Sequence, residues 1–135
     1  MNKKEVTITY TSRMYDTDEQ INMTAKGIMG KKDGVYIVMY NEENEGMAPT
    51  RTILKFNQDF LKVSKMGVTK TDMHYERGYT HKSRYNTFVG AYDMCIKTEE
   101  YTLEEKENGY NIVTVYNLEL DDNFISKCKV EISIC

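Results

Sequence analysis

The amino-acid sequence predicts an all-β fold, a single antiparallel up-and-down barrel of about eight to ten strands. Turn sequences recur at fairly regular intervals, and the Asp-Gly pair at 33–34 and the Asn-Gly pair at 108–109 favour two-residue hairpin turns. The stretches between the turns are rich in Val, Ile, Thr, Tyr and Phe, which fit a pleated surface. Closing such strands into a barrel buries their apolar faces and removes unpaired edges.

Alternation with a period of two assigns one inward face to each strand along the chain. The first strand turns Val6, Ile8 and Tyr10 inward, and the second turns the residues at 21, 23 and 25 inward. The last three strands follow the same rule, with the inward residues Phe88, Gly90, Tyr92, Met94 and Ile96, then Tyr110, Ile112, Thr114, Tyr116, Leu118 and Leu120, and finally Phe124, Cys128, Val130, Ile132 and Ile134. Residues 17–20 and 102–105 carry helix-start signals, so a helical turn is an alternative at each.

The strand at 35–40, VYIVMY, has no polar face. One interpretation is a strand that is covered on both sides within the monomer. The other is a contact with a second copy of the chain or another protein through the exterior of this strand, including Tyr36, Val38 and Tyr40.

Composition restricts the class of protein. With 135 residues the chain fits one domain, spanning residues 1–135, and 40% hydrophobic with 29% charged residues is typical of a soluble globular protein. The first residues, MNKKEVTITY, lack the apolar stretch of a signal peptide, and no apolar run is long enough to span a membrane. A net charge of −3 gives no general attraction to nucleic acid. Three cysteines without a pairing pattern suit the cytoplasm.

The segment 77–90, RGYTHKSRYNTFVG, is unusually polar for a barrel strand. Its alternation turns an imidazole, two phenols and a hydroxyl inward, and a buried polar group without a partner costs about 1–3 kcal/mol. These groups therefore need bonds to one another, to water or to a ligand. By the same alternation Arg77 falls on the inward face, where its side chain could cap the barrel mouth or extend into water. With residues of neighbouring strands they form a predicted partly polar cavity, lined by Thr52, Tyr75, Arg77, Tyr79, His81, Ser83 and Tyr85.

Catalytic and metal-binding patterns are not evident in the sequence. His81 and Ser83 share a face, but two strand positions separate backbones by about 6.6 Å, too far for a nucleophile and its base. The two histidines, at 74 and 81, have opposite parity and the cysteines are scattered, so no zinc-type ligand set is expected. Neither a catalytic residue nor a cofactor is predicted.

The sequence favours a non-enzymatic function, the binding of a small amphipathic molecule inside the barrel. The alternative is a barrel filled by its own side chains that serves as a structural or protein-interaction module, with a homodimer through the exterior of 35–40 as one form. An enzyme with His81 as general base beside Tyr85 is the third hypothesis. Neither nucleic acid nor membrane is an expected partner.

Several motifs resemble one known family. They are Gly46-Met47, TRTILK at 50–55, Met73-His74-Tyr75 with Gly78, and HKSRYNT at 81–87 with Gly90. Together they resemble the YwiB-like family of bacterial proteins over nearly the whole chain. The resemblance implies a small cytoplasmic, calycin-like or lipocalin-like antiparallel barrel, and it brings no established activity or cofactor. The sequence departs from the family at Phe88, where members often have proline.

Overall fold

Ten β-strands make up the structure, a computed structural model that describes residues 3–42, 49–67, 70–87 and 90–135. Phe88 and Gly46-Met47 lie outside the described residues. No helix in the described ranges is long and apolar enough to cross a membrane. The strands are β1 (Lys4–Met14), β2 (Glu19–Lys32), β3 (Val35–Glu42), β4 (Thr50–Phe56), β5 (Phe60–Met66), β6 (Lys70–Glu76), β7 (Thr80–Thr87), β8 (Gly90–Lys106), β9 (Gly109–Leu120) and β10 (Asn123–Ile134).

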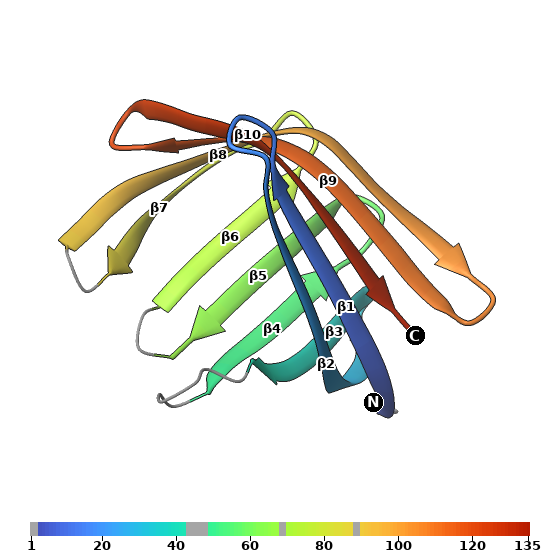
Figure 1. The fold of residues 1–135 in the computed structure, drawn as a ribbon. Coiled ribbons are helices and arrows are strands. Elements are labelled where there is room, and N and C mark those ends of the chain that lie inside the picture. Colours follow the sequence, from blue (N-terminus) through green and yellow to red (C-terminus); the bar gives the residue numbers. More distant parts are fainter. Residues whose placement is uncertain (1–2, 43–48, 68–69, 88–89) are drawn as a thin grey trace.

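All ten strands belong to one antiparallel sheet that curls into a nearly closed barrel (Figure 1). The order around the sheet is β6-β5-β4-β3-β2-β1-β10-β9-β8-β7, so strands adjacent in sequence are also adjacent in space. The first and last strands pair over seven positions, from Ile8 with Ile134 to Met14 with Cys128. Thr7 and Cys135 extend this ladder by exchanging two backbone hydrogen bonds. The predicted all-β antiparallel up-and-down barrel is confirmed.

The ladder is interrupted between β6 and β7, although these strands follow each other in sequence. The connecting turn explains the interruption. Gly78 has a φ of 76° and donates its N–H to the carbonyl of Thr98, while Thr98 donates to the carbonyl of Tyr79. The turn is therefore bonded to β8, which directs β7 along β8 and leaves a seam between β6 and β7.

The Asp-Gly turn forms as predicted, whereas the turn near the Asn-Gly pair has Glu107 and Asn108 as its central residues and Gly109 already pairs with Lys106 in the strand. Asp33 and Gly34 have φ values of 52° and 78°, the positive pair that a type I′ hairpin turn requires. The helical turns considered at 17–20 and 102–105 are wrong. Residues 102–105 lie inside β8, and 17–18 form the turn that joins β1 to β2. In both places the alternating pattern of the neighbouring strands outweighs the local capping signal.

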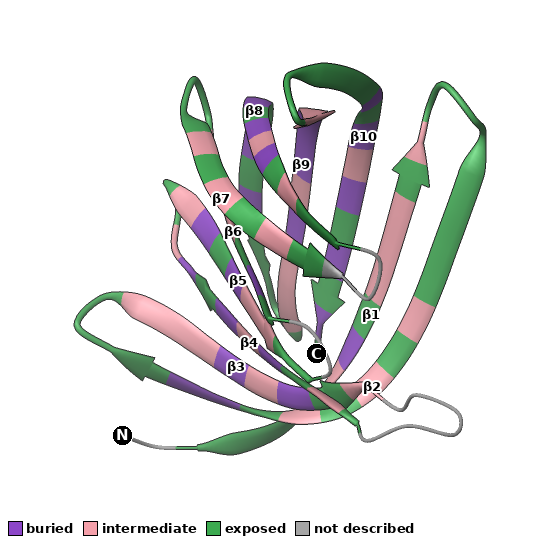
Figure 2. Cartoon of the chain, turned by 90° about the vertical axis from the view of Figure 1, so that its left-hand side faces the viewer, coloured by how far each residue is buried: buried purple, intermediate pink, exposed green. Residues whose placement is uncertain are grey.

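Buried and exposed positions alternate along the strands (Figure 2), and the buried side chains form the core of the barrel. The most completely buried hydrophobic side chains are Ile8, Val38, Leu54, Phe56, Leu61, Ile96, Ile112, Val130, Ile132 and Ile134. One end of the barrel is closed by the ring cluster of Tyr36, Phe56 and Tyr110, whose centroids lie 4.6–6.0 Å apart. We call it the aromatic end. The opposite end, where β3, β5, β7 and β9 finish, carries half-buried polar and methionine side chains and is called the polar end.

The facing of β3 corrects one sequence-based hypothesis. Val38 and Tyr40 point inward, with exposed fractions of 0% and 5%, and Tyr36 packs in the aromatic end. The exterior of this strand is formed by its odd-numbered residues, among them Ile37 and Met39. The alternation of a strand allows only one of the two sets to face outward. An exterior contact through β3 would therefore use the odd-numbered set.

We expect the Ile8→Ala substitution to lower the free energy of unfolding by about 2–5 kcal/mol, because it removes buried volume where β1 meets the core. Thr9→Ala is the matched control, since Thr9 is the exposed neighbour on the same strand and its loss should change stability by less than about 0.5 kcal/mol. Urea denaturation measures both. Equal effects of the two substitutions would contradict the assignment of the inner face.

Candidate functional site

A half-buried ion pair lies on the inner face of the polar end. The Lys65 Nζ is 3.0 Å from the Glu42 Oε1, and the exposed fractions of the two side chains are 27% and 20%. Thr52, fully buried, donates its hydroxyl to the same carboxylate oxygen at 3.3 Å. Lys65 faces inward because it pairs across the sheet with Thr52 on one side and Thr71 on the other, both buried. The pair carries no net charge and keeps part of its hydrogen-bonding capacity accessible.

Two tyrosines pack around this pair. The Lys65 Nζ lies 5.6 Å from the centroid of the Tyr10 ring. Burial raises the pKa of Tyr10, and burial followed by the nearby Glu42 charge raises the pKa of Tyr40. Both phenols therefore stay protonated over the physiological range and can serve as hydrogen-bond donors.

Deeper in the barrel, Tyr75 and Tyr116 pack with ring centroids 4.9 Å apart. The Tyr75 hydroxyl donates to the Met73 sulfur at 3.2 Å. Burial is the main cause that raises the pKa of both tyrosines, and it also raises the pKa of the Cys128 thiol beside them. A neutral, buried thiol is a poor nucleophile, so this cluster has the character of a packed polar layer.

The remaining inner surface of the polar end is apolar and only partly covered. The half-buried side chains that pack against the core there are Tyr10, Met14, Met23, Ala25, Met73, Tyr85, Leu118 and Leu120. Three of these are methionines, whose unbranched side chains adapt to ligands of different shape. The polar end thus combines a polar group with an adaptable apolar lining.

A groove of about 570 Å³ runs along the line where β2 and β3 separate. Their backbone pairing stops at Gly27 and Tyr40, and beyond this point the strands follow different neighbours. Met23 and Ala25 line one side of the groove, and Glu42 lines the other. Glu42 therefore connects the ion pair to the exterior of the barrel.

Ser83 and Tyr85 face inward as predicted. Ser83 pairs across the sheet with Met94, a core residue, and Tyr85 packs against the core. The Ser83 Oγ is buried and has no hydrogen-bond partner among the described residues; the same holds for the Thr98 Oγ1. A hydroxyl in this state is available to a ligand or to water.

His81 has a structural role at the seam. Its Nε2 lies 3.1 Å from the carbonyl oxygen of Asp72 on β6. A carbonyl oxygen only accepts, so the Nε2 carries the proton and donates it. The imidazole thereby links β7 to β6 where the backbone ladder is missing.

Tyr79 does not point into the barrel, which corrects the sequence-based expectation. It lies in the turn before β7, is 42% exposed, and packs its ring against His74 with centroids 4.6 Å apart. Arg77 lies exposed in the same turn. Strand alternation does not extend through a turn whose glycine has a positive φ, so parity gave the wrong side for Tyr79.

The structure brings only part of the predicted set together. Thr52 belongs to the ion-pair network, Tyr75 to the deeper layer, and Ser83 and Tyr85 to the inner face of β7. The sequence reasoning missed Glu42 and Lys65. Alternation could have revealed them. Glu42 lies two positions after Tyr40, and Lys65 lies two positions after Val63 and four after Leu61, so both fall on the buried face of their strands.

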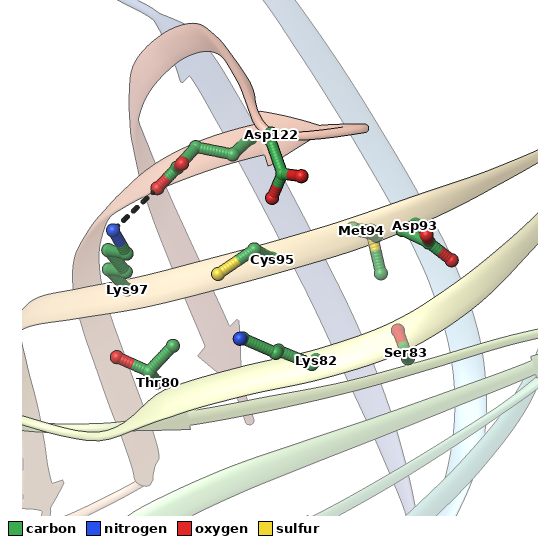
Figure 3. Close-up of a pocket in the computed structure, with 9 residues that line it drawn as sticks. Thr80, Lys82, Ser83, Asp93, Met94, Cys95, Lys97 and Asp122 are labelled. Atoms are coloured by element: carbon green, nitrogen blue, oxygen red, sulfur yellow. Dashed lines mark ion pairs between the residues drawn. The ribbon is translucent and has the colours of Figure 1, made fainter.

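A second groove, of about 550 Å³, lies along β7 and β8, where Ser83 and Met94 line it together with outward-facing residues (Figure 3). Lys82 and Cys95 pair across these strands, and Lys97 follows on the same face. Lys97 is bound to Glu119 at 2.8 Å, the ion pair drawn in Figure 3. Lysines and carboxylates both line this groove, so it has no dominant charge and is a weaker candidate than the polar end.

Comparison with known proteins agrees with this architecture. The sequence profile of the family described as "Domain of unknown function (DUF1934)" matches residues 6–132. The chain belongs to this family. The crystal structure of the ywiB protein from Bacillus subtilis is similar to this DUF1934 barrel, with a TM-score of 0.84 and 18% identity over 98% of this chain and 91% of that chain. The resemblance seen in the sequence is confirmed, and at this identity the structural likeness shows the fold alone. No curated protein matches the chain.

The DUF1934 barrel shows no cluster of three or more His, Cys, Asp or Glu side chains suited to a metal ion within its described ranges. What the polar end offers is a set of hydrogen-bonding groups beside an apolar lining. This combination suits recognition of a molecule with a polar and an apolar part.

Raising the pH should destabilise this DUF1934 barrel. Burial raises the pKa of Tyr40, Tyr75, Tyr101 and Tyr116, so in the folded state these phenols keep protons that the unfolded chain releases near pH 10. Their stabilising contribution is complete below about pH 10 and is lost as the pH rises further. Urea denaturation at increasing pH should show this decline, and Tyr116→Phe should make it shallower. An unchanged slope in the variant would contradict the assignment.

Removing the His81 imidazole should loosen the seam. We expect His81→Ala to cost about 1 kcal/mol of unfolding free energy. It should also speed hydrogen exchange of β6 and β7 amides more than those of β9. Lys82→Ala, which changes the outward neighbour on the same strand, is the control. Exchange that rises equally in both variants would show that the bond to Asp72 has no such role.

Proposed function

We propose that this DUF1934 barrel binds a small amphipathic molecule at its polar end and acts without catalysis. The observation that carries the proposal is the half-buried Glu42–Lys65 pair among half-buried methionine and leucine side chains. A charged pair at this depth is costly to desolvate unless its remaining donors and acceptors are satisfied. A polar head group would satisfy them, and an apolar tail would cover the surrounding side chains.

The neutrality of the pair favours one kind of head group. Lys65 has donors left after its bond to Glu42, and the carboxylate has acceptor sites left after accepting from Lys65 and Thr52. An uncharged group with hydroxyls can use both kinds of site. A carboxylate would have to compete with Glu42 for the ammonium. The ligand class that fits is therefore a neutral amphiphile with a hydroxylated head.

The Ser83 hydroxyl on β7 is a further polar group available to a ligand, because it is buried without a partner among the described residues. Cytoplasmic location is part of the proposal as well. The described cysteines, Cys95, Cys128 and Cys135, are free thiols, which suits a reducing compartment.

A protein-interaction module is the second candidate function. The middle of the barrel is filled by fully buried side chains such as Phe56 and Ile112, and the exterior of β2 and β3 leaves Ile28 45% exposed beside half-buried Ile37 and Met39. A second copy of the chain or another protein could cover these residues. This candidate does not require a ligand at the polar end.

Native mass spectrometry of freshly purified protein should show a retained small molecule or, in its absence, binding of added 1-monododecanoylglycerol. Lys65→Met should weaken binding of this probe at least about tenfold, the effect of losing one charge-assisted hydrogen bond. Lys62→Met, on the outward face of the same strand, is the matched control and should bind as the parent does. A bare mass with no binding of the probe would refute the proposal.

A further inference from the structure

The outer face of β2 to β5 combines apolar and basic side chains. It is the opposite side of the strands whose inner residues form the core, so its members are fixed by alternation. We call it the basic face and define it by Lys26, Ile28, Ile37, Met39, Arg51, Ile53, Lys55 and Lys62.

Cross-strand register arranges this face in two rows. In the first row Ile28 pairs with Met39, and Met39 pairs with Ile53, giving an apolar line across three strands. In the second row Ile37 pairs with Lys55, and Lys55 pairs with Lys62. The apolar line therefore runs beside a pair of lysines.

The Lys55–Lys62 pair is an electrostatic anomaly. Like charges directly opposite each other on a sheet are destabilising. Neither lysine forms an ion pair in the described structure, whereas Lys65, Lys97, Lys127 and Lys129 each have a carboxylate partner within 3.1 Å. Two uncompensated cations are thus held together in a chain whose net charge is −3.

We infer that the basic face docks an acidic, partly apolar segment of another protein. Carboxylates of such a segment would neutralise Lys55 and Lys62, and its apolar side chains would cover the line of Ile28, Met39 and Ile53. The acidic residues that border this line on the neighbouring strands, Glu5 opposite Ile28 and Asp72 opposite Ser64, limit the positive region to the centre of the face. The inference does not rest on ligand binding at the polar end, although Lys26, Ile28 and Met39 also line the groove between β2 and β3.

A second copy of the chain fits this face poorly. A twofold dimer brings the same patch of both copies together, so Lys55 and Lys62 would face a surface with the same cations. The side chains that define the face contain no carboxylate to pair with them. An acidic segment of a different protein removes this repulsion.

A membrane or single-stranded nucleic acid fits less well than a protein. Both commonly use aromatic side chains, as interfacial anchors or as stacking platforms. The basic face has none among its members, and Phe60 at its border lies beneath the Lys62 ammonium, 5.3 Å from ring centroid to nitrogen. Isoleucine and methionine side chains in the middle of strands, beside the groove between β2 and β3, offer an apolar surface suited to a protein segment.

The probe for this inference is a fluorescein-labelled amphipathic helical peptide with leucines on one face and glutamates beside them. Its control peptide replaces every glutamate with glutamine. Fluorescence anisotropy should show binding of the glutamate peptide that weakens as salt rises, and at least tenfold weaker binding of the glutamine peptide. The double variant Lys55→Glu/Lys62→Glu should lose at least tenfold in affinity.

Lys82→Glu, on the outer face of β7, is the matched control and should bind the peptide as the parent does. Equal binding of both peptides, or equal losses in the double variant and in Lys82→Glu, would overturn the inference. So would tighter binding to phosphatidylglycerol vesicles or oligothymidylate than to the peptide. Light scattering that shows a dimer of the free protein, dispersed by Ile37→Glu, would assign the face to a second copy. Retention of a small molecule by the double variant would show that the polar end acts separately.

Discussion

The pairing of β1 with β10 is the constraint on which the rest of the structure depends. It joins the two ends of the chain, so that a succession of hairpins becomes a barrel with an inside and an outside. Without it both strands would expose edges, and Ile8 and Ile132 would lose their cover. The sheet still has one interruption, and the turn at 77–79 decides where it falls. By bonding to Thr98 the turn aligns β7 with β8, and the His81 imidazole bonds to β6 where the described residues show no backbone ladder.

The two ends of the barrel show how the interior is divided between stability and recognition. Tyr36, Phe56 and Tyr110 stack at the aromatic end, and the Tyr101 hydroxyl there donates to the carbonyls of Asn57 and Phe60. These contacts are apolar or satisfied within the chain. At the polar end the side chains are only half covered, and a charged pair takes the place of an aromatic cluster. The fold tolerates the free-energy cost of a half-buried charged pair at the polar end because the aromatic end and the middle of the barrel supply the packed core.

Most of the fold could be predicted because it follows from local rules. Alternation fixed the inner faces in the middle of the long strands, and the Asp-Gly pair fixed a hairpin turn. Alternation was wrong for Ile21 and Phe124, which are 65% and 59% exposed near strand ends, and for Phe124 the register of β10 shifts directly after it. The site was harder, for two physical reasons. Tyr79 was misplaced because its turn breaks the alternation. The Glu42–Lys65 pair was missed because charged residues on a buried parity can be recognised only when their partner strand is known, and β3 and β5 meet this pair across the intervening β4.

Strands β3 to β5 serve the interior and the exterior with alternate residues. On β5, Lys62 projects outward to the basic face while Lys65 projects inward to the ion pair. Successive side chains of a strand face opposite sides of the sheet, and the register of the sheet holds both sets at fixed spacing. A protein segment bound to the basic face would therefore contact the same three strands that position Glu42, Thr52 and Lys65. Since β3 ends beside the groove between β2 and β3, an effect of one site on the other would have to pass through the register of these strands or the separation of β3 from β2.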